Sequence, residues 1–355
     1  MKNLVIWIVY DSITSSIFPG QILRPLLQKK NIDTDVVIIS FEPKKLSKIS
    51  IEKLIPKTSG VKYIELKRPP FIGRPALFYS IQQLKKELKH FENYKIIARC
   101  SFASWISKKS VSSKCIALTL QARAIIAEEY AYTHDKSWNI IKKILHKFKE
   151  NACRSIEKTA YLPHKTIPTK VEAVSQALSE YLTSVYKVPK STIYIAKDDI
   201  PTVITEKQKQ LWRKAIRKKL HISDDVTLYC YNGSAKPWQC PDKTIVFFNT
   251  QYKKNKNTRF LIITNDTDIF IEKLKKTPLP KKTTCIMSIK HRNIYKYLAA
   301  CDYGIIFREK HIVNWTSRPT KILEYKAARV PIIHNNTVKI ITSTKTPCCE
   351  TIEVT

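Results

Sequence analysis

A lysine and a glutamate one helical turn apart, Lys321 and Glu324, lie in the segment SRPTKILEYKAARVPII, residues 317–333. The proline favours a helix start there, and a helix N-terminus attracts anions through its unpaired N–H groups and partial positive charge. Lys321 adds a full charge for a phosphate, whereas the Glu324 carboxylate suits the two hydroxyls of a ribose. Pro319, Thr320, Lys321 and Glu324 therefore predict a nucleoside diphosphate site. The pair alone leaves an ion pair on a solvated helix equally open.

The second half of the chain contains five apolar runs, TLYCYNG, RFLIIT, TCIMSI, YGIIF and VPIIH, separated by helical segments. This alternation predicts a doubly wound parallel sheet, in which ligands bind at the carboxyl ends of the strands. The residues of interest that follow these strands are Gly233, Ser234, Lys236, Thr264 to Asp266 and Arg308. Gly233 also permits close approach of the backbone to a ligand. Neither G-x-G-x-x-G nor a P-loop occurs, which argues against a dinucleotide or P-loop site.

The first half has a similar rhythm, with the runs LVIWIVY, TDVVIIS, YKIIAR, CIALTL and KVEAVS and a helical segment QALSEYLTSVY. A chain of 355 residues is long enough for two cores. We therefore expect an α/β protein of two Rossmann-like domains that face each other across a cleft. The charged, proline-containing stretch KVPKSTIYIAKDDIP reads as the connection, so the expected domains are residues 1–185 and 186–345.

Residues 137–160 predict a long amphipathic helix, with Ile140, Ile141, Ile144, Leu145 and Phe148 at helical spacing and lysines on the other face. Such a helix could rest on an anionic membrane. Packing between the parts of a basic protein is the simpler interpretation. The sequence leaves both open.

The chain is strongly basic, with 63 Lys and Arg against 29 Asp and Glu, a formal net charge of +34. Nucleic acid, anionic membranes and phosphorylated substrates are the partners that such a charge invites. A bias towards lysine and asparagine throughout the chain would explain the excess equally well. No zinc-finger, RRM or helix-turn-helix pattern occurs, so nucleic acid is not the expected partner.

The nine cysteines form no C-x-x-C pair, which indicates reduced thiols and no metal site. The first apolar run, NLVIWIVY, has the length of a strand and lacks a cleavage site after it. We therefore expect a cytoplasmic protein, associated with a membrane at most peripherally at its inner face.

Several segments together resemble a known family. YNGSAKPWQ, FLIIT, YLAACDYGIIF and SRPTKILEYKAARVPII, in this order, resemble the donor-binding domain of glycosyltransferase family 4, the retaining group 1 transferases of GT-B fold. LTLQARAIIAEEY is similar to the D-x-R-G-x-x-x-x-E segment of one subset, and VEAVSQALSEYL to the strand–serine–helix that closes the first domain. The resemblance covers about residues 1–340.

The resemblance implies transfer of a sugar, with retention and without a metal or cofactor, from a donor such as a UDP- or GDP-sugar. The acceptor would be a glycan, a lipid-linked molecule or a small molecule. Lys321, Glu324 and Lys236 would be the catalytic residues: fixed positive charge would help the nucleoside diphosphate leave, and Glu324 would take the ribose. The implied donor-binding residues are Gly233, Ser234, Arg308, Pro319 and Thr320, and the implied acceptor-side residues are Gly20, Arg99, Arg123 and Glu128.

The chain also departs from the family pattern. Thr316 stands where many members have a first glutamate, and Gln121 and Ala124 replace an aspartate and a glycine. Arg329 replaces the glycine after the EYKAA helix, and the chain ends without the long helix that crosses back to the first domain. There are two alternatives to an active enzyme. One is a degenerate transferase that acts as a binding protein, and the other is a basic nucleic-acid-binding protein.

Overall fold

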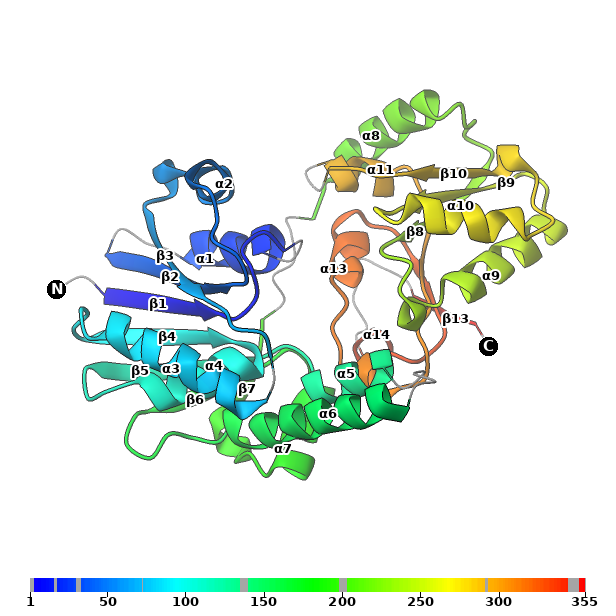
Figure 1. The fold of residues 1–355 in the computed structure, drawn as a ribbon. Helices are drawn as coiled ribbons and strands as arrows, with labels where there is room; N and C mark the ends of the chain where they lie inside the picture. The colour runs from blue at the N-terminus through cyan, green and yellow to red at the C-terminus, as the bar shows by residue number, and fades with distance from the viewer. Residues whose placement is uncertain are drawn as a thin grey trace. The chain divides into compact units, whose positions relative to one another are not determined.

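The chain forms two compact units, Met1–Ala196 and Lys197–Thr355, each built on its own sheet (Figure 1). The computed structural model describes residues 3–15, 18–29, 33–71, 73–134, 140–197, 203–290, 293–343 and 351–354. The division falls eleven residues later than the expected boundary at 185/186, because the turn after the helix QALSEYLTSVY leads into one more strand of the first sheet.

In the described part of the first unit, seven parallel strands take the order β3-β2-β1-β4-β5-β6-β7. The strands are β1 (Asn3–Val9), β2 (Thr34–Glu42), β3 (Val61–Lys67), β4 (Tyr94–Arg99), β5 (Cys115–Ala122), β6 (Thr169–Ala173) and β7 (Ile193–Ile195). The apolar runs predict the five inner strands, which are buried on both faces. The apolar runs do not predict the edge strands β3 and β7, because these strands contain few buried residues.

The helices of the first unit are η1 (Pro19–Leu23), α1 (Arg24–Lys29), α2 (Lys48–Leu54), η2 (Lys57–Ser59), α3 (Arg74–Leu88), α4 (Cys100–Ser110), α5 (Ile126–His134), α6 (Ile140–Ala160), α7 (Gln176–Tyr186) and η3 (Lys190–Thr192). α7 has the bounds of the predicted segment, and its first turn is capped by Ser175, whose hydroxyl accepts the Leu178 N–H. η1, α1 and α2 pack on the sheet face that carries Trp7, Val9 and Val36.

The second sheet has six parallel strands among the described residues, in the order β10-β9-β8-β11-β12-β13. They are β8 (Thr227–Asn232), β9 (Thr258–Ile263), β10 (Thr284–Met287), β11 (Tyr303–Ile306), β12 (Ile332–His334) and β13 (Thr351–Glu353). The first five are the predicted strands, and β13 adds an edge that the sequence did not predict. The doubly wound α/β fold class is confirmed in both units.

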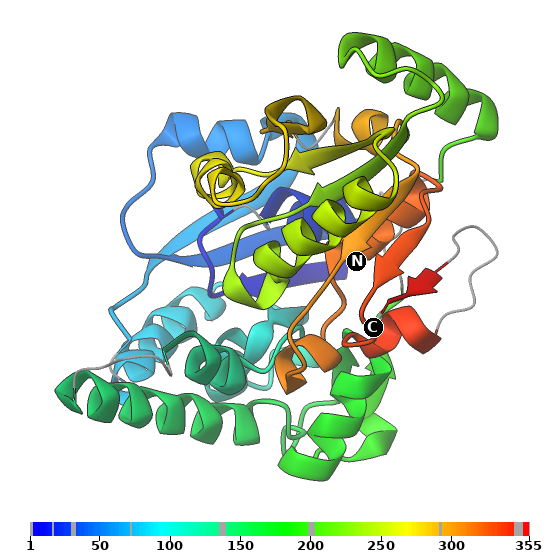
Figure 2. The same cartoon turned by 90° about the vertical axis from the view of Figure 1, so that its right-hand side faces the viewer.

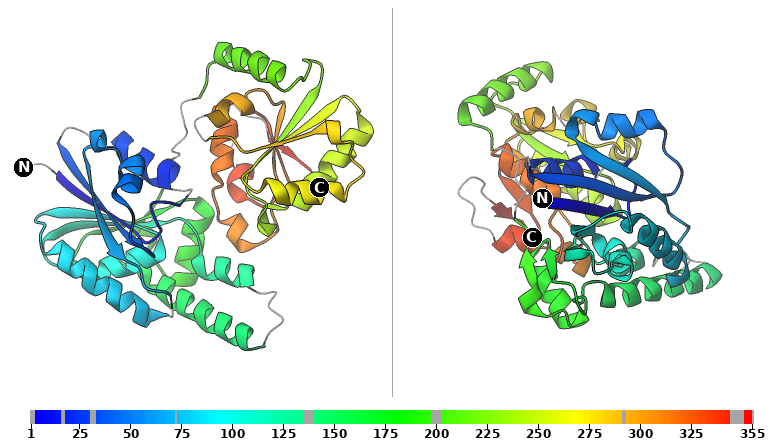
Figure 3. Two further views of the ribbon diagram at one scale, coloured as in Figure 1. Left: turned by 45° about the horizontal axis from the view of Figure 1, so that its top comes forward. Right: turned by 90° about the vertical axis from the view of Figure 1, so that its left-hand side faces the viewer.

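The helices of the second unit cover both faces of this sheet (Figure 3, left). They are α8 (Glu206–Lys219), η4 (Pro237–Gln239), α9 (Pro241–Lys254), α10 (Thr267–Lys275), η5 (Lys281–Thr283), α11 (Ile294–Leu298), α12 (Ile312–Trp315), α13 (Thr320–Ala327) and α14 (Lys339–Ser343). α9 lies across one face (Figure 2), where Ile245 and Phe248 pack on Tyr229 and Phe260. α8, α11 and α13 contribute to the apolar cluster on the opposite face.

Among the described helices, none combines the length and the apolar character needed to cross a bilayer. The seven cysteines in the described part of the chain are free thiols.

Candidate functional site

The strand order of the second sheet reverses between β8 and β11, which is where open α/β sheets bind ligands. The ladder between these two strands contains only two pairs, Tyr303 with Tyr229 and Gly304 with Cys230. β8 continues to Asn232, whereas β11 is not paired with this last part of it. The carboxyl end of β8 therefore has polar backbone groups that another element must satisfy.

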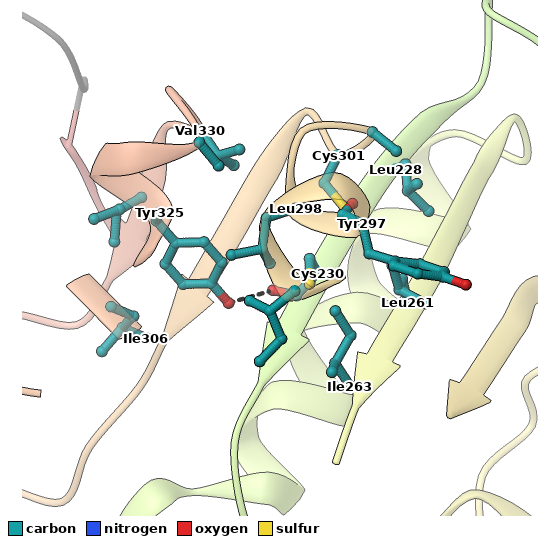
Figure 4. Close-up of a cluster of buried hydrophobic side chains, with 14 of the residues drawn as sticks. Leu228, Cys230, Leu261, Ile263, Tyr297, Leu298, Cys301, Ile306, Tyr325 and Val330 are labelled. Atoms are coloured by element: carbon teal, nitrogen blue, oxygen red, sulfur yellow. Dashed lines mark hydrogen bonds between the residues drawn. The ribbon is translucent and has the colours of Figure 1, made fainter. Parts of the chain in front are cut away.

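Tyr325 of α13 satisfies them. Its hydroxyl accepts a hydrogen bond from the Asn232 N–H, with the two heavy atoms 3.1 Å apart. It donates to the Cys230 carbonyl oxygen at 3.2 Å, as Figure 4 shows. The ring lies against Gly304, where an added Cβ would come within 2.5 Å of Cε1 of Tyr325. Tyr325 thus fixes α13 against the carboxyl end of β8.

Glu324, the neighbour of Tyr325, is fixed at the same strand end. Its Oε2 accepts a hydrogen bond from Nδ2 of Asn232 at 2.6 Å, and the residue is half-buried. The carboxylate is therefore oriented by a strand residue that the sequence analysis did not single out.

Lys321 is buried, with 6% of its surface exposed, so it is not part of a solvated ion pair. Its Nζ donates to Oε1 of Gln239 at 2.9 Å and lies 4.5 Å from the centre of the Tyr231 ring. Burial lowers the pKa of Lys321 well below its ordinary value, the positive charge of Arg308 lowers it further, and Glu324 partly opposes both. A buried cation with neutral contacts suits an anionic ligand.

Gly233 makes room for this lysine. Its φ of +153° is one that residues with a side chain rarely adopt, and an added Cβ would lie 2.7 Å from Oε1 of Gln239 and 2.8 Å from Nζ of Lys321. Ser234 continues the same turn: its hydroxyl accepts from Nε2 of Gln239 at 2.7 Å, and its carbonyl oxygen from the Tyr231 hydroxyl at 2.6 Å.

Arg308, which follows β11, is a second buried cation beside Tyr231. Asn335 holds its backbone, accepting from the Arg308 N–H at 3.1 Å and donating to the Arg308 carbonyl oxygen at 2.8 Å. Within the described residues, Nε of Arg308 is buried without a hydrogen-bond partner. Burial lowers the pKa of this guanidinium as well.

The start of α13 completes this group. Thr320 is the first helical residue, Pro319 precedes it, and no side chain caps the first turn. The helix therefore presents its amino end beside Lys321. In contrast, Lys236 is exposed, and its Nζ lies 4.9 Å from the centre of the Trp238 ring. The structure thus gathers Gly233, Ser234 and Arg308 with the start of α13, whereas the Lys236 ammonium lies over the Trp238 ring.

Other residues fix the loops around this group. Oδ2 of Asp266 accepts from the Ala235 N–H at 2.7 Å, which ties the loop after β9 to the loop after β8. Tyr231, Asn232, Gln239 and Tyr325 were not identified from the sequence as site residues. The segment YNGSAKPWQ contains three of them, but only the fold shows that they contact α13.

The two departures from the family pattern have defined local structures. Thr316 is buried, and its hydroxyl donates to the Ile312 carbonyl oxygen at 2.9 Å, so it stabilises α12. Arg329 adopts the left-handed conformation, with φ of +54°, that glycine adopts most easily at a helix C-terminus. Its Nε donates to the Ile204 carbonyl oxygen at 2.7 Å, which attaches the segment before α8 to the end of α13.

In the first unit, Arg99 and Arg123 lie at the carboxyl ends of β4 and β5. Nη2 of Arg99 donates to Oε1 of Gln21 at 2.6 Å, which joins β4 to η1, the helix that contains Gly20. Arg123 forms an ion pair with Glu172, which also accepts from Gln121 and from the Tyr194 hydroxyl. Both arginine Nε atoms are buried without partners among the described residues.

Glu128 takes a different position from these arginines. Its Oε1 accepts from Nη1 of Arg154 on α6 at 2.8 Å, so it joins α5 to α6. Its neighbour Glu129 is exposed and contributes to the raised pKa of the Cys100 thiol, next to Arg99, although burial is the main cause. Arg99 and Arg123 thus lie at strand ends with η1, the helix of Gly20, beside Arg99, whereas the described contact of Glu128 is with Arg154.

Solved structures share this GT-B fold of two Rossmann-like units in succession. The chain is similar to a glycosyltransferase from Rickettsia africae ESF-5 (TM-score 0.63, 13% identity, covering 99% of this chain and 84% of that one). It is also similar to sucrose-phosphate synthase from Thermosynechococcus elongatus (TM-score 0.66, 12% identity, 99% and 86%). A third is the catalytic domain of starch synthase IV from Arabidopsis thaliana, bound to ADP and acarbose (TM-score 0.58, 10% identity, 98% and 85%). No protein-family profile and no curated protein matches the sequence.

Proposed function

We propose that the protein is a glycosyltransferase that moves a sugar from a nucleoside diphosphate donor to an acceptor hydroxyl. The observation that carries this proposal is the buried Lys321, held beside Arg308 at the amino end of α13. Two desolvated cations and a helix start at the switch point of a Rossmann-like sheet suit a diphosphate. The glycosyltransferase fold of the similar structures supports the same assignment.

Each site residue has a distinct part in this proposal. Lys321, Arg308 and the first amides of α13 bind the diphosphate, which keeps both cations charged by offsetting the unfavourable effect of their burial. Gly233 and Ser234 bring the backbone close to the phosphates. Glu324, oriented by Asn232, accepts hydrogen bonds from the ribose hydroxyls.

The reaction needs no covalent intermediate on the protein. The bond between the anomeric carbon and the diphosphate oxygen breaks, and its electron pair leaves with the diphosphate. The acceptor oxygen bonds to the same carbon, and its proton passes to the departing diphosphate oxygen. Fixed positive charge stabilises the developing charge on the leaving group. The proposal includes transfer with retention, without a metal or other cofactor, by a member of family 4. It also includes a catalytic part for Lys236 and an acceptor site near Arg99 and Arg123.

Calorimetric titration tests the donor site. Lys321→Met removes the cation but fills the same space, so we expect the variant to fold and to lose much more affinity for UDP or GDP than for uridine or guanosine. Glu324→Gln should weaken diphosphate and nucleoside alike. If both variants bind like the parent, the site is not where we place it.

Turnover separates an active transferase from a degenerate one that only binds. The protein should release nucleoside diphosphate from the nucleotide-sugar donor, and Lys321→Met should slow this release. Donor binding without release under any acceptor panel would favour the binding protein. Neither the fold nor the site favours the nucleic-acid alternative.

A further inference from the structure

The first half of α6 exposes a continuous apolar face. Its five large apolar side chains are between 54% and 76% exposed, although the Phe148 ring lies beside Gly73. They are Ile140, Ile141, Ile144, Leu145 and Phe148. At 3.6 residues per turn they occupy one arc of about 140°. We call this set the α6 apolar face.

The opposite side of the helix contacts the rest of the first unit. His146 lies about 170° from the centre of the apolar arc, and its Nδ1 is hydrogen-bonded to the Tyr130 hydroxyl of α5 at 2.8 Å. Glu150 on the same side is buried and pairs with Arg154. The α6 apolar face lies largely on the side away from these contacts, with Ile144 at the rim of the hollow between α5 and α6.

Lysines border this face on both sides. Lys142 and Lys149 lie beyond one edge and Lys143 and Lys147 beyond the other, about 20–60° from the nearest apolar side chain. An apolar stripe between two rows of lysines has the composition of helices that lie in the headgroup region of a bilayer.

The second half of α6 holds the helix in place. Cys153, Ile156 and Ala160 are buried, Arg154 pairs with Glu128, and Nη2 of Arg74 on α3 donates to the Ser155 hydroxyl at 2.5 Å. The exposed half is thus the continuation of a helix fixed by packing and by polar contacts.

We propose that the α6 apolar face is a docking surface for an anionic phospholipid bilayer. Charge decides between this occupant and a second copy of the chain. Self-association would bring the bordering lysines of two copies together, in a protein whose net charge is +34, whereas anionic headgroups neutralise them. The inference does not depend on sugar transfer.

Vesicle flotation tests the apolar part. The protein should float with phosphatidylcholine vesicles that contain about one-third phosphatidylglycerol and stay in solution with phosphatidylcholine alone. Ile141→Ser with Ile144→Ser should weaken binding roughly tenfold or more. The matched control is Leu211→Ser with Val246→Ser, two side chains of the second unit that are 67% and 63% exposed. It should bind like the parent.

A second pair of variants tests the charge. Lys142→Gln with Lys143→Gln should weaken flotation and its salt dependence, whereas Lys214→Gln with Lys218→Gln, which removes the same charge from α8, should change it much less. Unchanged melting temperatures verify folding. The proposal is overturned if the parent does not float, if the α6 and control variants lose equal affinity, or if light scattering shows a dimer that Ile141→Ser with Ile144→Ser dissociates while flotation is unaffected.

Discussion

Lys321 and Gly233 depend on each other, because the lysine ammonium and the Gln239 amide occupy the space that any side chain at position 233 would fill. Both neighbouring atoms are ends of flexible side chains and can move. A side chain at position 233 would therefore affect the position of the cation more than the stability of the fold.

Gly233→Ala should consequently weaken nucleoside diphosphate binding about tenfold or more, with a loss of about 1–2 kcal/mol in unfolding free energy from the backbone conformation. Calorimetry and denaturant unfolding measure the two effects. Gly73→Ala is the control, since its φ is +102° but the nearest atom to an added Cβ is 3.7 Å away. It should lose stability and keep nucleotide affinity. Equal affinity in the two variants would contradict the placement of Lys321.

Glu157 gives the first unit a pH dependence with a definite sign. It accepts from the N–H groups of Ile126 and Ala127 and from the Tyr186 hydroxyl, yet burial outweighs these contacts and raises its pKa from 4.5 to about 7. Between these values the folded state holds a proton that the unfolded state has lost. Its contribution to stability is therefore complete below pH 4.5 and is lost as the pH rises through 7.

The loss should approach about 3 kcal/mol over that range, at about 1.4 kcal/mol per pH unit. Denaturant unfolding of the parent and of Glu157→Gln at several pH values isolates the contribution of Glu157 to the free energy of unfolding, because all other titrating groups are common to both. The free energy of unfolding of the parent minus that of the variant should fall by about 3 kcal/mol as the pH rises from 4.5 to 7. A constant or rising value would mean that Glu157 is already ionised in the fold at pH 4.5.

At the scale of elements, Arg329 at the end of α13 adopts a left-handed conformation that glycine adopts more easily. The left-handed φ of Arg329 carries an energetic penalty, whereas its hydrogen bond to the Ile204 carbonyl oxygen is stabilising. The two effects are of similar size, about 1 kcal/mol each.

Arg329→Gly should therefore leave the unfolding free energy nearly unchanged, because it removes both the strain and the hydrogen bond. Arg329→Ala removes the hydrogen bond but keeps the strain, so it should be less stable than the glycine variant by about 1 kcal/mol. Thermal or urea unfolding distinguishes the two. If alanine is as stable as glycine, the strain at this position is negligible.

At the scale of the whole molecule, each unit has its own sheet and its own apolar clusters. The residues gathered around Lys321 all belong to the second unit. Residues 197–355 expressed alone should fold and bind nucleoside diphosphate with an affinity within about tenfold of the full chain. Circular dichroism and calorimetry check this. A folded fragment without affinity would mean that the site requires residues of the first unit.

Much of this architecture could be predicted from the sequence, because inner parallel strands are apolar runs and α7 has a serine cap. The edge strands β3 and β7 could not, since partly exposed strands lack that signal. The start of α13 and the pair Lys321 and Glu324 follow from local pattern. The burial of Lys321 and its contact with Gln239, 82 positions away, depend on packing between distant segments. The same holds for the contact of Glu128 with Arg154.

Gly304 and Tyr325 have a consequence for how this sequence can diverge. Any side chain at position 304 would overlap the tyrosine ring, and loss of the tyrosine hydroxyl would leave the Asn232 N–H and the Cys230 carbonyl without that partner. Neither position can change alone without harm, so the two form an epistatic pair. Among descendants of this chain, we expect glycine to persist at 304 for as long as an aromatic residue occupies 325, and replacements to arise at both together.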